Sequence, residues 1–152
     1  MCAYHRKSWN EKLHIDRKPL IEKADKNFGG VKAGQMMLVP TPLVVDEYIR
    51  QIPKGKQVDI PTIRKDLAAA YHAEVTCPLT TGIFVRICAE AAYESYKLGK
   101  PLKSITPFWR VINERSPAAK KLTFGTYFLK EQRRKEKGEF AESEEESLLK
   151  EK

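Results

Sequence analysis

Residues 104–112 read Ser-Ile-Thr-Pro-Phe-Trp-Arg-Val-Ile, so two large aromatic side chains and an arginine lie between a proline and a β-branched pair. Pro107 fixes its own φ and has no backbone donor, and it biases Thr106 towards extended geometry. The β-branched pair favours a short extended segment against a core. We therefore expect a stiff turn at 104–112, called the elbow below, which presents Phe108, Trp109 and Arg110.

Two interpretations of the aromatic pair are open at this stage. Phe and Trp side chains usually pack in a core, which would make the elbow a buried corner. Alternatively, Phe108 and Trp109 line a binding pocket. For Arg110, hydrogen bonding to backbone carbonyls is the preferred interpretation over a phosphate contact.

The length and composition limit the classes of protein to which this chain can belong. A chain of 152 residues is enough for one domain with a proper core. It has no apolar run of the roughly 18 residues that cross a membrane, and its N-terminus lacks the apolar stretch of a signal peptide. We expect a cytoplasmic, nucleoid or nuclear protein that is not secreted and has no membrane partner. Three cysteines without CxxC spacing and three scattered histidines predict no disulfide framework, metal or other cofactor.

The charge is unevenly distributed along the chain. Residues 100–137 hold 11 basic and 3 acidic side chains, whereas residues 139–152 hold 6 acidic and 2 basic ones. The most basic region therefore contains the elbow. A basic face favours a polyanionic partner, most often nucleic acid, and a solvated lysine-rich surface is the alternative.

Residues 1–40 are expected to form an N-terminal extension that packs on the domain without a core of its own. Ser8 and Glu11 have capping-box spacing, which predicts a short helix near 9–15. The apolar run 36–39 predicts a strand or a docked arm.

The remaining chain reads as mainly α. Thr41-Pro42 begins a helix that ends at 53–56, and Asp59 begins another that runs to about residue 72. A connector leads to a longer helix over 79–98, which Gly99 and a following proline end. This pair of helices is typical of a helix-turn-helix.

After the elbow, a basic amphipathic helix is expected over 120–137, with a disordered or weakly helical acidic tail over 139–152. The expected organisation is an extension (1–40), a domain (41–138) and a tail (139–152).

Three segments resemble motifs of a known family. Residues 52–58, IPKGKQV, look like its "(I/V)PxGxV" motif, and residues 100–112, KPLKSITPFWRVI, look like "NPxxxxxPCHRVI" at identical spacing. Residues 125–138 resemble its last helix, which ends in "EG". Over 43–138 the chain is thus similar to the DNA-binding domain of O6-alkylguanine-DNA alkyltransferases and their non-catalytic alkyltransferase-like relatives. The resemblance implies a mainly α, winged helix-turn-helix fold.

The resemblance also implies the loss of the family's chemistry. The nucleophilic cysteine corresponds to Phe108, and the histidine that relays its proton through water to a glutamate corresponds to Trp109. Lys100 replaces a supporting asparagine, and Ile60 replaces a tyrosine that helps to rotate the phosphate. The glutamate falls on Lys137, with Glu136 one residue away. We therefore expect a protein that is not an enzyme and that recognises an alkylated or flipped base, as alkyltransferase-like proteins do.

Further contacts with double-stranded DNA are expected from helix ends and basic side chains. Thr80 and Thr81 open the long helix, where free amides favour phosphate, although they could equally only cap it. The family's arginine finger has no clear match, and Arg86 lies one turn further on. The other phosphate candidates are Arg64, Lys65, Lys100, Lys103, Lys120 and Lys121.

The expected assembly is a monomer that binds DNA, alkylated DNA included, and that has a repair protein as a further partner. Two alternatives are a DNA alkyltransferase that uses Cys77, near the start of the long helix, and a protein-interaction module that has lost DNA binding. For Cys77, a buried apolar role is the preferred interpretation.

Overall fold

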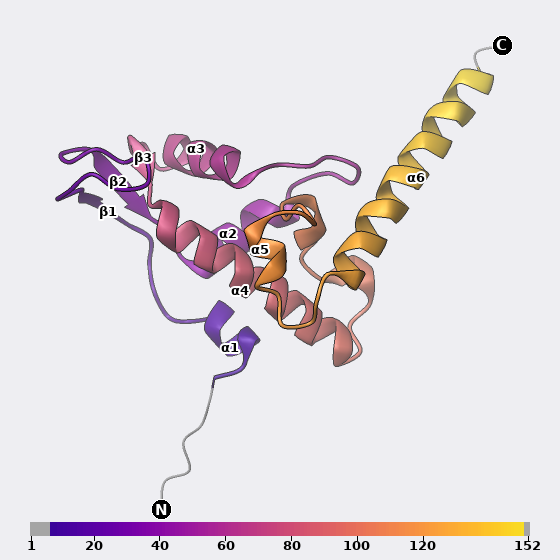
Figure 1. The fold of residues 1–152 in the computed structure, drawn as a ribbon, viewed down its shortest axis with the longest axis horizontal. Coiled ribbons are helices and arrows are strands. Elements are labelled where there is room, and N and C mark those ends of the chain that lie inside the picture. Colours follow the sequence, from indigo (N-terminus) through magenta and orange to yellow (C-terminus); the bar gives the residue numbers. More distant parts are fainter. Residues whose placement is uncertain (1–6, 151–152) are drawn as a thin grey trace, which may run out of the picture.

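The computed structural model describes residues 7–150, and the side chains of residues 7–138. It is mainly α-helical, with one small three-stranded sheet at one end (Figure 1). None of the helices in the described part is both long and apolar enough to cross a membrane. The elements are α1 (Trp9–Leu13), β1 (Leu20–Lys23), β2 (Met36–Val39), α2 (Pro42–Arg50), α3 (Ile60–Ala70), β3 (Val75–Thr76), α4 (Pro78–Lys97), η1 (Leu102–Ser104), η2 (Phe108–Arg110), α5 (Pro117–Lys120) and α6 (Tyr127–Lys150), where η is a single 3₁₀ turn.

The caps expected from the sequence begin three of the helices. The Ser8 side chain and Glu11 form the capping box of α1. The Thr41 hydroxyl accepts a hydrogen bond at the start of α2, and the Asp59 carboxylate does so at the start of α3. Each cap satisfies a backbone N–H that has no partner within its helix. α4 begins at Pro78, one residue before its expected start.

Helix α4 is the central element of the fold. Figure 1 shows it running diagonally through the domain, and both α1 and α2 pack along it. The core joins these helices to the elbow and to the first turns of α6. Its fully buried larger side chains include Leu38, Ile49, Ile63, Val85, Phe108, Ile112 and Leu129.

The N-terminal extension adds strands to the domain. β2 lies in the middle of the sheet, antiparallel to β1 and parallel to β3, with Leu38 opposite Thr76. Beside the main core, a second small cluster buries Ala24, Val31 and Met37 of the extension. The extension contacts the rest of the chain through α1, which packs on α4, and through β2, which pairs with β3. It also has apolar clustering of its own, which was not expected and which Cys77 completes.

The hairpin before β2 closes on the start of α4. Gly29 has φ +52, and a Cβ atom built there would lie 2.7 Å from Cγ of Pro78. A side chain at this position would have to displace the first turn of α4. The start of the helix that was expected to reach DNA is therefore partly covered by the N-terminal extension.

The segment after α4 differs from the sequence prediction in two ways. The turn of the elbow is a single 3₁₀ turn, Phe108–Arg110. Val111 and Ile112, which were expected to be extended, close this turn instead, because the carbonyl of Phe108 accepts from the N–H groups of both. The expected helix over 120–137 is divided between α5 and α6. Gly125 has φ +78, and the Glu90 carboxylate holds the backbone and the hydroxyl of Thr123, so this stretch forms a loop.

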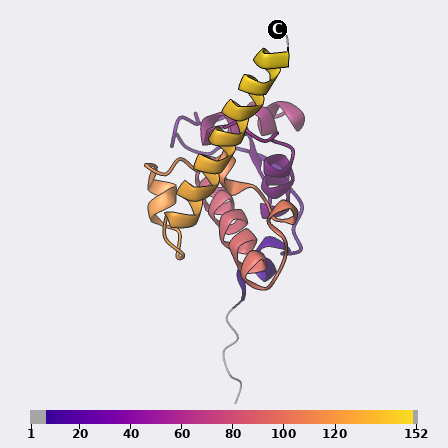
Figure 2. The same ribbon diagram turned by 90° about the vertical axis from the view of Figure 1, so that its right-hand side faces the viewer.

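Helix α6 continues to Lys150 and projects from the body of the domain in two perpendicular views (Figures 1 and 2). It thereby includes most of the stretch 139–152 that was expected to be disordered or weakly helical. Glu, Lys and Ala are good helix formers, which accounts for the continuation past Gly138. Residues 151–152 lie outside the described part.

Helices α3 and α4 end in the same motif with different residues. His72 follows α3 with φ 58, in the left-handed region. Its N–H donates to Ala69 and that of Ala73 donates to Ala68, which is the hydrogen-bond pair of a Schellman motif. Gly99 occupies the equivalent place after α4, with φ 107. A side chain with a Cβ is strained in this region, whereas glycine is not.

Replacing His72 with glycine should therefore raise the free energy of unfolding by about 1 kcal/mol. Gly99→Ala should lower it by a similar amount, and His72→Ala should leave it within about 0.5 kcal/mol of wild type. Urea denaturation followed by circular dichroism measures all three. A His72→Gly variant no more stable than His72→Ala would contradict this reading of the helix end.

Candidate nucleic-acid interface

Phe108, the first aromatic residue of the elbow, is part of the core. Its side chain is 0% exposed, and its ring centroid lies 5.4 Å from Trp109, 5.7 Å from Phe124 and 5.8 Å from Phe128. These distances are typical of packed aromatic pairs. Of the two interpretations for this residue, the structure therefore places Phe108 in a buried aromatic corner.

Trp109 and Arg110 share one carboxylate, that of Glu136 on α6. The indole Nε1 donates to Oε1 of Glu136 over 2.8 Å, and the Nε and Nη2 atoms of Arg110 donate to the same oxygen over 2.9 and 2.7 Å. Arg110 also donates through Nη1 to the carbonyl of Ile52, as expected for a structural arginine. The backbone N–H of Gly55 reaches the other carboxylate oxygen over 3.3 Å. Glu136 thus ties the elbow, α6 and the loop after α2 together.

The surroundings of Glu136 set its protonation. Burial alone would raise the pKa of this carboxyl, but hydrogen bonds from Arg110 and Trp109 and the adjacent guanidinium charge outweigh it and leave the pKa below its ordinary value. The Glu136 and Arg110 side chains are 12% and 15% exposed, so solvent screens this pair only weakly. At neutral pH the group is therefore a charged, fully engaged acceptor.

A second residue of α6 fixes the backbone of the elbow. The Nη1 atom of Arg133 donates to the carbonyls of Trp109 and Ile112, over 2.9 and 3.0 Å, and Nη2 donates to Oε1 of Gln57. These carbonyls would otherwise lack partners in a partly buried turn. Two α6 side chains one turn apart, Arg133 and Glu136, therefore hold the elbow rigidly.

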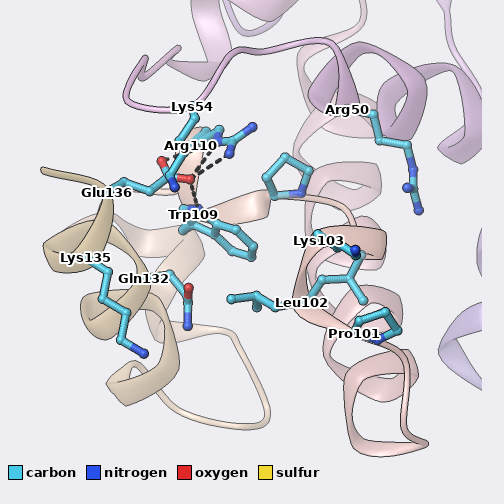
Figure 3. Close-up of a pocket in the computed structure, with 12 residues that line it drawn as sticks. Arg50, Lys54, Pro101, Leu102, Lys103, Trp109, Arg110, Gln132, Lys135 and Glu136 are labelled. Carbon is cyan, nitrogen blue, oxygen red and sulfur yellow. Dashed lines mark hydrogen bonds and ion pairs between the residues drawn. The ribbon is translucent and has the colours of Figure 1, made fainter. Parts of the chain in front are cut away.

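An open cavity of about 590 Å³ lies beside Trp109, between the elbow, η1 and α6, and is called the elbow cavity below (Figure 3). Its apolar wall includes Leu102, Pro107 and the indole of Trp109, and Gln132 projects into it from α6. The indole is only 4% exposed, so it presents a narrow strip of its surface to the cavity. The basic side chains among the lining residues are Arg50, Lys54, Lys103, Arg110 and Lys135.

Several of these cavity residues are absent from the sequence-based site. Gln132, Lys135 and Glu136 have i, i+3 and i+4 spacing on α6, which places them on one face of a helix. That periodicity could have indicated a common surface. Arg50 and Lys54 come from the end of α2 and the loop after it, and no local pattern links them to the elbow.

The residues expected to contact DNA at the start of α4 lie apart from the cavity. α4 has 20 residues, so its first residue lies about 28 Å along the axis from its last. The hydroxyl of the fully buried Thr81 donates to the carbonyl of Cys77, four residues back, and does not cap the helix, and the buried Thr80 hydroxyl has no partner within the described residues. Arg86 lies over the ring of Trp9, 5.5 Å from its centroid.

The other predicted residues are distributed over several surfaces. Arg64 donates through Nε to the carbonyl of Thr76, and Lys65 is exposed on the same helix. Of the two lysines before the elbow, Lys103 lines the elbow cavity, whereas Lys100 lines a separate polar cavity of about 90 Å³. Both lysines at the end of α5, Lys120 and Lys121, are exposed.

Cys77 is buried in the small cluster with Ala24, Val31 and Met37. Its position agrees with the apolar role preferred from the sequence. Within the described part of the chain, no three His, Cys, Asp or Glu side chains gather closely enough to hold a metal ion. Comparisons with protein-family models, with curated proteins and with solved structures found no match to this chain.

Proposed function

We propose that this protein is a non-catalytic DNA-binding protein of the alkyltransferase-like type, and that the elbow cavity accepts an altered or extruded base. The observation that carries the proposal is the cavity itself, which combines an apolar wall at Trp109 with basic side chains from four segments of the chain. Stacking on an aromatic side chain and neutralisation of phosphates are the two main sources of affinity for an unpaired nucleotide. The exposed strip of Trp109 and the basic side chains, which could supply these two contributions, face the same cavity.

The proposal includes the absence of alkyl transfer at the elbow, because neither aromatic residue can act as a nucleophile or a base. The Phe108 side chain is hydrocarbon, and the Trp109 indole is a hydrogen-bond donor that cannot act as a base. Glu136 also supports the family resemblance, because it pairs with the residue at the histidine position as the family's glutamate does. It is displaced by one residue from the position that the motif alignment predicts.

The mainly α fold has a small sheet, and we propose that α3 and α4 are the helix-turn-helix of a winged domain. β3 lies within their connection, and Asp59 caps α3. In this arrangement the DNA contacts lie at the end of α4 that carries the elbow. The start of α4 is partly covered by the hairpin around Gly29.

One observation favours a second candidate, a protein-interaction module. Leu79 and Ile83 lie one turn apart near the start of α4 and are 66% and 48% exposed. Neighbouring exposed apolar side chains of this size are more typical of a protein contact than of a phosphate contact. Absence of any DNA binding would leave this pair as the functional surface.

The test of the proposal is salt-dependent binding to a labelled duplex, measured by fluorescence anisotropy. If the cavity cations neutralise about four phosphates, the affinity should fall about a hundredfold between roughly 50 and 200 mM salt. Replacing Lys103 and Lys135 with glutamine should reduce the slope of log K against log salt by about 2. Both side chains are exposed at the cavity, so the fold should be unaffected.

The matched control replaces two exposed lysines of the N-terminal hairpin, Lys23 and Lys32, with glutamine. This variant has the same net charge as the Lys103/Lys135 variant, but its changes lie away from the cavity. It should keep the wild-type slope. Equal losses in the two variants, or no duplex binding at low salt, would refute a DNA site at the elbow cavity.

A further inference from the structure

Gln132 is a buried polar residue whose amide makes no hydrogen bond within the described part of the chain. The residue is 7% exposed and lines the elbow cavity. Figure 3 shows its side chain extending from α6 towards Leu102, into the space beside Trp109. The amide atoms are accessible from the cavity and are not sealed off from solvent, so a ligand that enters the cavity can reach them.

The neighbours of Gln132 on α6 do not supply a hydrogen-bond partner for its amide. Leu129, one turn earlier, is fully buried in the core, and Phe128 packs in the aromatic cluster. One turn later, Glu136 is already engaged by Trp109 and Arg110. The Gln132 amide therefore remains available to a ligand in the cavity, where it can donate and accept a hydrogen bond side by side.

The cavity walls define what such a ligand looks like. Trp109, Pro107 and Leu102 offer apolar contact, and Lys103 and Lys135 stand around the opening with positive charge. A group that fits is planar, has an edge with adjacent donor and acceptor atoms, and is attached to phosphate. An unpaired nucleobase has these properties, and bidentate pairing of glutamine with a base edge is an established form of recognition.

We propose that Gln132 is the specificity-determining residue of this cavity and reads the hydrogen-bonding edge of the unpaired base. This inference rests on the proposed function. It adds that affinity depends on the base edge itself as well as on phosphates and on stacking. The amide and stacking then together supply the part of binding that an abasic nucleotide cannot obtain.

The experiment compares two duplexes, one with a single bulged guanine and one with an abasic residue in the same bulge. A bulge removes most of the cost of extruding the base. The wild-type protein should bind the guanine bulge about tenfold more tightly than the abasic bulge. Gln132→Met, which keeps the shape and removes the amide, should bind the abasic bulge as tightly as wild type does and the guanine bulge less tightly than wild type does. Only the part of the preference that stacking supplies should remain.

The control is Gln51→Met, at an exposed position at the end of α2, which should keep the tenfold preference. Gln132→Leu is the second variant, needed if thermal unfolding shows that Gln132→Met is poorly folded, and its preference should also be reduced. A full wild-type preference in a folded Gln132 variant overturns the inference, and so does wild-type protein that binds the two bulges equally. Failure of wild type to bind either duplex refutes the proposed function itself.

Discussion

Glu136→Gln is expected to lower the free energy of unfolding by about 3 kcal/mol, the size typical for breaking a buried charge pair. The carboxylate accepts hydrogen bonds from Trp109, from Arg110 and from the backbone of Gly55. An amide of the same shape offers one acceptor oxygen and turns an N–H group towards these donors. The variant therefore leaves the Arg110 charge without its counter-ion at a site only 15% exposed.

The effect of this substitution should depend on pH in a defined direction. The pKa of Glu136 is lower in the folded protein than its ordinary value of 4.5. Its stabilising contribution is therefore complete above that value and is lost as the pH falls through the folded pKa. The stability difference between wild type and Glu136→Gln should be constant near neutral pH and should narrow below about pH 4.5.

Glu131→Gln is the matched control. Glu131 lies on the same helix and pairs with Arg134 over 3.0 Å, but the Arg134 side chain is 70% exposed. Such a surface pair contributes little, so this variant should lose less than about 0.5 kcal/mol. Chemical denaturation at several pH values measures both variants. Equal losses in the two, or a Glu136→Gln effect unchanged down to about pH 3, would contradict the role assigned to the Glu136 carboxylate.

Much of the local structure could be predicted because its causes are local. Thr41 and Asp59 cap their helices through bonds to residues three positions on, and Gly99 ends α4 through its own conformation. The division of the expected basic helix could not be predicted in this way. It depends on Glu90, a residue of α4 that holds Thr123 across 33 positions of sequence.

Some residues that line the elbow cavity could be predicted from the sequence, and others could not. The spacing of the elbow and its two prolines indicated Trp109 and Arg110, which do line the cavity. The same pattern suggested Phe108, which lies in the core because the 3₁₀ turn directs successive side chains to different environments. Thr80 and Thr81 were expected nearby, but the length of α4 separates them from the elbow. Glu136 and Gln132 are brought in by α6, whose position follows from packing and not from local sequence.

The central claim is that a nucleobase enters the elbow cavity beside Trp109, and this residue can report on that event directly. The chain has two tryptophans, and Trp9 lies on α1 and does not line the cavity. In a Trp9→Phe variant, the emission comes from Trp109 alone. A base that contacts the exposed strip of the indole should quench this emission.

The measurement is a titration of the Trp9→Phe variant with the bulged-guanine duplex, followed at once by anisotropy of the labelled DNA and by emission of the protein. The account predicts that Trp109 emission falls saturably, along the same curve as the anisotropy, and that the abasic bulge quenches it much less. Saturable DNA binding with unchanged Trp109 emission would contradict the account, because it would place the DNA on the surface of the protein and leave the elbow cavity empty.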